Sequence, residues 1–356
     1  MRVLPIHPVS EYNTGDLLTY YGSKNIMKHA FGEDVEFLHV DSRRAEAELH
    51  TYVPEYNWGD VDVVLVCGSP FLGVDVNNTK CIMLKQAVER YPKAKRIALG
   101  VGSSFRHNNV YFNNYYDYSD RNASSNKKAI DNTKELFDDF DLVISRDSFT
   151  QGLLDLAKIK SEMYFDTSAF YYSGFGSKDR KDNLFIYSNP LTMDSWGHAP
   201  EGVWRIYNEV FSDLFSRYNT IVITSQDKGY LDGLGVKSLF CTDLEYLKYL
   251  YSNANSVTSV KVHQAIFASC CGAPTTLFAT DSRFMTARNF NVMVQTEIID
   301  LDDIPQHKTD YRLESIRKQG GEGNLFGDLT PPSLWFDIDK VPEYLDWFKE
   351  RLVSVI

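Results

Sequence analysis

Short runs of β-favouring residues alternate with helical segments along most of this chain, and this alternation constrains the fold more than any other feature. Residues 61–66 are almost continuously apolar, as expected for a parallel strand buried on both faces. Similar runs occupy residues 3–6, 35–40, 96–101 and 141–145, with helical segments at 17–30, 80–90 and 146–157. The pattern predicts an α/β fold built on a parallel sheet covered by helices on both faces.

A second alternation follows a stretch rich in Gly, Ser and charge at residues 171–182, which we interpret as a linker. Its strand-like runs are residues 184–187, 220–224, 236–240, 256–260 and 275–278. A chain of 356 residues exceeds what one core usually organises. We therefore expect an N-terminal Rossmann-like domain at 1–175, a second one at 176–310, and a tail at 311–356. The tail ends in an amphipathic helix, and the sequence leaves open which domain it packs on.

Two doubly wound domains of this kind usually face each other across a cleft. Ligands then bind at the carboxyl ends of the parallel strands. The expected functional residues are therefore those that come directly after strands.

Composition excludes several classes of protein. The net charge of −11 argues against nucleic-acid or membrane-surface binding, because both partners repel an acidic surface. The five cysteines include no C-x-x-C pair, which predicts buried, reduced thiols in a cytoplasmic protein. No apolar run approaches the ~20 residues that span a bilayer, and the first residues lack a signal-peptide pattern. The histidines have no metal-ligand spacing, so no metal is expected.

The turn at residues 259–266 is the strongest candidate for chemistry. Lys261 and His263 stand two residues apart, where an apolar run gives way to a helix of small residues. Such a turn presents side chains and free backbone N–H groups to one crevice. It suits an anionic ligand that also receives a proton. The alternative is a histidine with a purely structural role, and the residues alone do not decide.

A second candidate is the turn from Asn13 to Asp16 after the first strand. Gly15 lets the backbone approach a ligand, and the helix N-terminus supplies hydrogen-bond donors. The alternative is a capped helix with Asp16 in its first turn, and the two interpretations are compatible. No G-x-G-x-x-G or P-loop pattern occurs in the sequence.

Positive charge follows two further strands. Arg146 ends a buried strand, where a guanidinium can bind a carboxylate or phosphate through two hydrogen bonds. We favour this role over the alternative, a weak surface pair with Asp147. The loop at 105–116 is rich in aromatic and amide side chains suited to sugars, and Arg106 and His107 add charge there. A loop packed by its own aromatic rings explains the composition equally well.

These landmarks, in this order, resemble the polysaccharide pyruvyl transferase family. They are Asn13–Asp16, Cys67–Ser69, Leu99–Gly102, Arg146–Asp147, Asp166–Ser168, Lys261–Gln264, Gly272–Pro274 and Asp281–Arg283. Lys261 stands where the family has an arginine, so a point charge replaces a two-pronged grip. Gln264 stands where the family has a glycine, which leaves less room for close approach of the backbone to a ligand.

The resemblance implies two Rossmann-like domains arranged as in GT-B glycosyltransferases. It also implies transfer of a pyruvyl group from phosphoenolpyruvate to two hydroxyls of one sugar, forming a ketal. No cofactor is implied besides this donor substrate. By the family match, His263 and Arg146 are the catalytic residues, with His263 as the general acid.

The family match also divides the remaining residues between the two substrates. Arg146, Lys261, Val262 and His263 would bind the donor. Asn13, Gly15, Asp16, Arg106 and His107 would face the carbohydrate acceptor.

Two other functions remain open at this stage. A GT-B-type glycosyltransferase using a nucleotide sugar would share the fold and would also need positive charge. A catalytically silent glycan-binding protein would share the fold alone. The sequence does not decide whether the chain forms a homo-oligomer.

Overall fold

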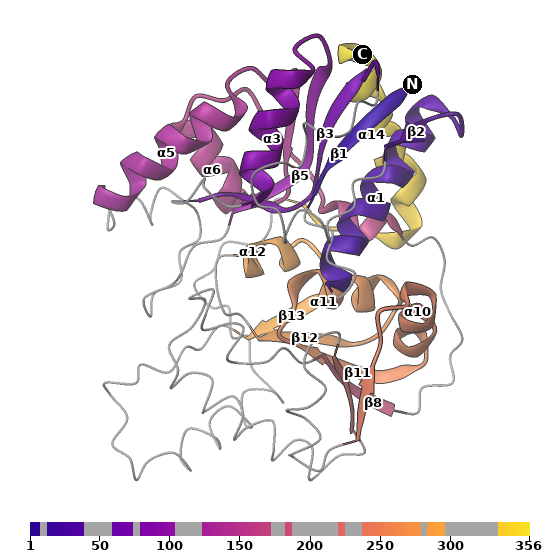
Figure 1. Cartoon of the computed structure of the whole chain (residues 1–356). Coiled ribbons are helices and arrows are strands. Elements are labelled where there is room, and N and C mark those ends of the chain that lie inside the picture. The colour runs from indigo at the N-terminus through magenta and orange to yellow at the C-terminus, as the bar shows by residue number, and fades with distance from the viewer. Residues whose placement is uncertain are drawn as a thin grey trace. The chain divides into compact units, whose positions relative to one another are not determined.

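The computed structural model describes most of the chain as two compact units. The described residues are 1–7, 13–38, 59–73, 79–103, 123–171, 182–186, 220–224, 237–278, 283–295 and 334–356. Unit 1 holds the described residues up to Tyr171 and again from Leu334 to the C-terminus. Unit 2 holds the described residues between them, drawn mainly in orange in Figure 1. The proposed linker at 171–182 lies outside the described residues except for its two end residues, and the aromatic loop at 105–116 lies wholly outside them.

Unit 1 is built on a parallel sheet whose central strands are fully buried. Its strands are β1 (Arg2–Ile6), β2 (Glu36–Phe37), β3 (Val63–Cys67), β4 (Pro70–Leu72), β5 (Lys95–Ser103), β6 (Leu142–Ser145) and β7 (Glu162–Met163). The order is β2-β1-β3-β5-β6-β7, with β4 paired to β5. The chain leaves β1 toward β2 on one side and returns to β3 on the other. The strand order therefore reverses between β1 and β3, and ligands of such sheets bind at the carboxyl ends of the two strands on either side of this point.

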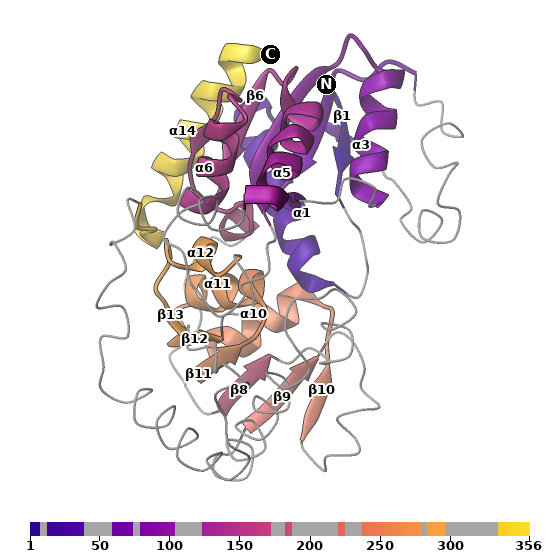
Figure 2. The same ribbon diagram turned by 90° about the vertical axis from the view of Figure 1, so that its left-hand side faces the viewer.

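Helices cover both faces of this sheet (Figures 1 and 2). They are α1 (Thr14–Phe31), α3 (Thr79–Arg90), α5 (Ala123–Phe137), α6 (Ser148–Leu156), the short 3-10 helix η1 (Thr167–Tyr171), η2 (Ile338–Lys340) and α14 (Val341–Val355). Helix α14 lies beside α1 (Figure 1), and η1 packs against α1. Helix α5 packs between α3 and α6.

The last helix, α14, belongs to unit 1, which answers the question the sequence left open. Trp347 stacks on Tyr164 with ring centroids 3.8 Å apart, and the Arg351 guanidinium lies over Trp347 at 4.0 Å. Phe348 is fully buried beside these rings. The aromatic contacts tie the C-terminal helix to a residue from the middle of the sequence in one core.

Unit 2 is a second parallel sheet with a different strand order. Its strands are β8 (Asp182–Ile186), β9 (Thr220–Thr224), β10 (Ser238–Phe240), β11 (Ala254–Ser259), β12 (Thr275–Phe278) and β13 (Val292–Gln295). The order is β10-β9-β8-β11-β12-β13, so the chain moves outward from β8 and then restarts at β11 on the other side. This is the dinucleotide-binding type of sheet, and its crevice lies between the carboxyl ends of β8 and β11.

The described helices of unit 2 are short and closely packed. They are α10 (Leu244–Ser252), α11 (Val262–Cys270) and α12 (Phe284–Ala287). Helix α11 ends where Gly272 adopts a φ of 81° and Ala273 N–H donates to the Ala268 carbonyl at 3.1 Å. This is a glycine-terminated helix end, and it lets the chain turn directly into β12.

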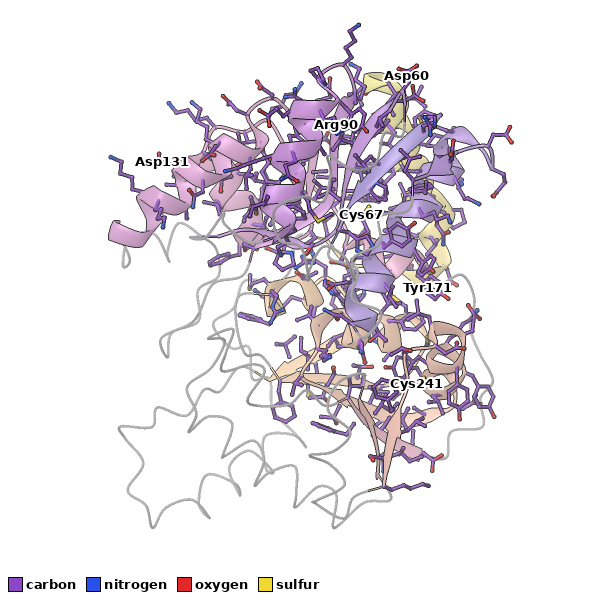
Figure 3. The ribbon with its side chains drawn as sticks, viewed as in Figure 1. Asp60, Cys67, Arg90, Asp131, Tyr171 and Cys241 are labelled. Atoms are coloured by element: carbon purple, nitrogen blue, oxygen red, sulfur yellow. The ribbon has the colours of Figure 1, made fainter. Side chains whose placement is uncertain are left out.

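The cysteines confirm the sequence prediction. All five are free and buried. Cys67, labelled in Figure 3, lies at the carboxyl end of β3, where burial raises the pKa of its thiol. Among the described residues no helix has the length and apolar character needed to cross a membrane.

Candidate functional site

The first half-site is the N-terminal turn of α1, at the crevice end of β1 in unit 1. Asn13 caps the helix: its Oδ1 accepts from Gly15 N–H at 3.2 Å, and its Nδ2 donates to Asp16 Oδ2 at 2.6 Å. The capping interpretation is therefore confirmed. Both polar side chains remain partly exposed, and an acceptor-binding role for Asn13, Gly15 and Asp16 stays a prediction.

Sequence reasoning missed one residue near this turn. His7 follows β1 directly and is only 3% exposed. Its ring stacks on Tyr20 of α1, with centroids 4.6 Å apart and an interplanar angle of 11°. Burial, with Cys67 nearby, raises the pKa of Tyr20 to about 12, so this ring stays neutral at physiological pH. Its position directly after the first strand is the signal that could have found His7.

Arg146 also follows a strand, β6, but its side chain turns inward. The guanidinium is wholly buried, with Nη1 3.1 Å from Oδ2 of Asp166 and Nε 3.9 Å from Oδ2 of Asp147. Asp147 is itself buried and caps α6 through Thr150 N–H at 2.7 Å. The alternative of an Arg146–Asp147 surface pair is therefore wrong, because both residues lie in the core. A role for Arg146 in donor binding stays a prediction.

The second half-site is the N-terminal turn of α11 in unit 2. It follows β11, one of the two strands that flank the crevice end of this sheet. The Ser259 hydroxyl accepts from Lys261 N–H and donates to the Lys261 carbonyl, each at 2.9 Å, which fixes the turn. Lys261 occupies the cap position without a side-chain capping bond, and Val262 and His263 form the first turn, all three partly exposed. A helix N-terminus with a lysine beside it attracts anions.

Gln264, where the family has a glycine, directs its side chain into unit 2. It is 2% exposed, and its Oε1 accepts from the Tyr251 hydroxyl at 3.1 Å. The extra atoms of the glutamine therefore lie between α10 and α11 instead of in front of the helix end.

The remaining predicted site residues are not placed by the structure. Arg106 and His107 lie outside the described residues. Within unit 1 the structure brings together Asn13, Gly15 and Asp16, and within unit 2 it brings together Lys261, Val262 and His263. Among the residues described, no group of three or more His, Cys, Asp or Glu could hold a metal ion.

A family model described as polysaccharide pyruvyl transferase matches residues 13–282. The chain belongs to this family. The match spans both half-sites and confirms the resemblance seen in the sequence motifs. No curated protein matches the chain.

Solved structures support the fold of this family member. S. aureus MnaA with UDP matches with a TM-score of 0.52 and 9% identity, covering 100% of this chain and 97% of that one. The Methanocaldococcus jannaschii UDP-GlcNAc 2-epimerase with UDP-GlcNAc and UDP matches with a TM-score of 0.51 and 10% identity, covering 100% and 99%. At such low identity these similarities show the fold alone. They confirm the predicted GT-B-like class of two Rossmann-like domains.

Proposed function

We propose that this chain transfers a pyruvyl group from phosphoenolpyruvate to two hydroxyls of one sugar in a glycan, forming a ketal. Family membership supports a transferase that acts on polysaccharide. The observation that supports this donor is the α11 turn, where Lys261 and His263 lie partly exposed at the crevice end of β11. Phosphoenolpyruvate carries both a phosphate and a carboxylate, and its methylene carbon must be protonated, so one cation and one acid in the same turn suit it.

The proposed chemistry begins with His263 as imidazolium. It gives its proton to the methylene carbon of the donor, and positive charge develops at the neighbouring carbon. Lys261 and the N–H groups at the start of α11, including that of Val262, hold the phosphate and carboxylate during this step. One sugar hydroxyl adds to the cationic carbon and loses its proton. Phosphate then leaves, and the second hydroxyl closes the ketal.

The protons balance in this scheme. The methylene carbon gains one proton from His263, and the two hydroxyls release one each. One of these restores the imidazolium and the other leaves with phosphate. Asn13 and Asp16 offer an amide and a carboxylate to sugar hydroxyls. The roles of Gly15, Arg106 and His107 in acceptor binding follow from the family match alone.

The test compares ligands and one variant. Phosphoenolpyruvate should raise the melting temperature of the native chain, whereas UDP at the same concentration should not. His263→Ala should keep most of this stabilisation, because Lys261 and the start of α11 remain, but should release phosphate about 10²–10⁴-fold more slowly in the presence of acceptor glycans. His29→Ala is the matched control, because His29 is a partly exposed histidine of unit 1 and its loss should leave phosphate release unchanged.

Two results would contradict the proposal. Stabilisation by UDP and not by phosphoenolpyruvate would favour a nucleotide-sugar glycosyltransferase. Full phosphate release by a folded His263→Ala variant would remove the acid from the mechanism.

A further inference from the structure

We propose that Arg146 and Asp166 are positioning residues, which hold the N-terminal turn of α1 in place through Thr167 and do not themselves contact the donor. This inference rests on the proposed function for the meaning of the α1 turn as the acceptor half-site. It replaces a direct role of Arg146 with an indirect one.

The electrostatics around Arg146 disfavour a direct grip on an anion. Two carboxylates, those of Asp166 and Asp147, lie within 3.1 and 3.9 Å of the guanidinium, and all three side chains are buried. These two carboxylates oppose the approach of a phosphate or carboxylate to the guanidinium. A Cβ on Gly102 would overlap the guanidinium, which shows how closely the side chain lies against β5.

The Arg146–Asp166 pair fixes the segment that follows Asp166. Oδ1 of Asp166 accepts a hydrogen bond from Ser168 N–H at 2.9 Å, while its Oδ2 accepts one from Nη1 of Arg146 at 3.1 Å. With both oxygens engaged, the carboxylate holds the turn that leads into η1. Thr167 stands in the middle of this turn and is fully buried.

Thr167 packs closely against three glycines, Gly22, Gly68 and Gly100, which lie in different parts of unit 1. A Cβ on Gly22 of α1 would overlap its carbonyl oxygen, and one on Gly68 would overlap its hydroxyl oxygen. A Cβ on Gly100 would come within 3.0 Å of its methyl group. Gly68 and Gly100 also have φ of 44° and 63°, which other residues rarely adopt. The space beside these glycines of unit 1 is therefore filled by Thr167 of the protein itself and not by a ligand.

Thr167 is linked to the N-terminal turn of α1 by a short series of hydrogen bonds. The Thr167 hydroxyl donates to the Thr19 carbonyl at 3.2 Å, and the Thr19 hydroxyl donates to the Asp16 carbonyl at 2.9 Å. Asp16 in turn pairs with the cap residue Asn13 at 2.6 Å. Loss of the ion pair should therefore loosen the first turn of α1 specifically.

The experiment measures hydrogen exchange and donor binding in the full-length chain. Asp166→Asn should speed amide exchange in residues 14–19 roughly tenfold, equal to about 1.4 kcal/mol of local opening free energy. Exchange in the first turn of α11 should stay unchanged. Exchange in strand β3 reports the loss of global stability of unit 1, so a larger acceleration in residues 14–19 than in β3 separates positioning from general destabilisation. Phosphoenolpyruvate affinity, measured by calorimetry, should change less than about twofold, because the donor residues lie in unit 2.

Arg146 variants supply the decisive comparison. Arg146→Lys keeps a cation beside Asp166 and should restore most of the slow exchange that Arg146→Met loses. A tenfold loss of phosphoenolpyruvate affinity in Arg146→Lys, with α1 exchange unchanged, would overturn the proposal and restore the direct grip. If Arg146→Met does not fold, Thr167→Val, which keeps the shape but removes the hydroxyl, tests the same linkage by exchange.

The two proposals can fail separately. Absence of any phosphoenolpyruvate binding by the native chain would refute the proposed donor, while the exchange comparison in unit 1 would still support or overturn the positioning role.

Discussion

The two units place a cation after a strand in opposite ways. In unit 1 the guanidinium of Arg146 is fully buried and neutralised by Asp166, whereas in unit 2 Lys261 caps a helix and stays partly exposed. Both residues follow strands of parallel sheets, where ligand sites gather. The difference teaches that position after a strand does not determine the direction of the side chain. A carboxylate twenty positions further along the chain determines it in unit 1.

The units also differ in how they use close packing. Unit 1 brings α1, β3 and β5 together around Thr167 by means of glycines. Unit 2 has Gln264 at a position that is glycine in the family, and a hydrogen bond to Tyr251 fills the space. The packing around Thr167 in unit 1 is therefore sensitive to added volume, whereas the packing of Gln264 in unit 2 depends on a hydrogen bond.

The largest expected effect contrasts the two cations. Arg146→Met should lower the free energy of unfolding by about 3–5 kcal/mol, because it leaves the Asp166 carboxylate buried without its guanidinium. Lys261→Met should change it by less than about 0.5 kcal/mol, because its ammonium is partly exposed. Urea unfolding of both variants measures the contrast. Equal losses of unfolding free energy would show that Arg146 and Lys261 contribute alike to stability.

A second prediction concerns the packing of α1 on η1. Gly22→Ala should cost about 3 kcal/mol, even though alanine favours a helix, because the added carbon meets the backbone carbonyl of Thr167. No side-chain rotation can relieve this overlap. Lys24→Ala in the same helix is the control and should cost less than about 1 kcal/mol. A stable Gly22→Ala variant would show that α1 can shift away from Thr167. Thermal unfolding measures the stability of both variants.

Much of the fold could be predicted from the sequence. The apolar run at 61–66 coincides with the buried strand β3, and the five cysteines are buried thiols as expected. The place of α14 could not be predicted, because an amphipathic helix reveals only that one face is buried. The partners that hold it, Tyr164 and Glu162, lie far away in the chain.

The places of the candidate residues at the starts of helices could be predicted from the sequence, but the directions of their side chains could not. The cap at Asn13 follows the local preference for Asn before a helix, and the structure has Lys261 at a helix start, as the strand-to-helix pattern predicted. The inward turn of Arg146 depends on Asp166, a contact between distant residues that periodicity does not reveal. The glycines of unit 1 gave a similar ambiguity, since a glycine admits a ligand or a neighbouring side chain equally well.

A smaller effect is expected for the buried polar pair of unit 2. Tyr251→Phe should cost about 1–2 kcal/mol, because it leaves the Gln264 amide oxygen buried without its donor. Tyr249→Phe is the matched control: it makes the same change in the same helix at a ring that is 62% exposed, and should cost almost nothing. Chemical unfolding compares the two. Equal stabilities would mean that the glutamine does not need the tyrosine hydroxyl.

The smallest effect at neutral pH, and one that grows with pH, comes from the thiol of Cys271. Burial raises its pKa to about 12, with the nearby Ser252 hydroxyl lowering it slightly. In the unfolded chain the thiol ionises near pH 8.5, so the unfolded state loses this proton first. The contribution to stability is therefore complete below about pH 8.5 and falls between there and pH 12, by at most about 1.4 kcal/mol per pH unit. Cys271→Ala should flatten the decline of unfolding free energy between pH 9 and 11 while leaving the slope at pH 7 unchanged; an unaltered alkaline slope would show that this thiol is open to water in the folded protein.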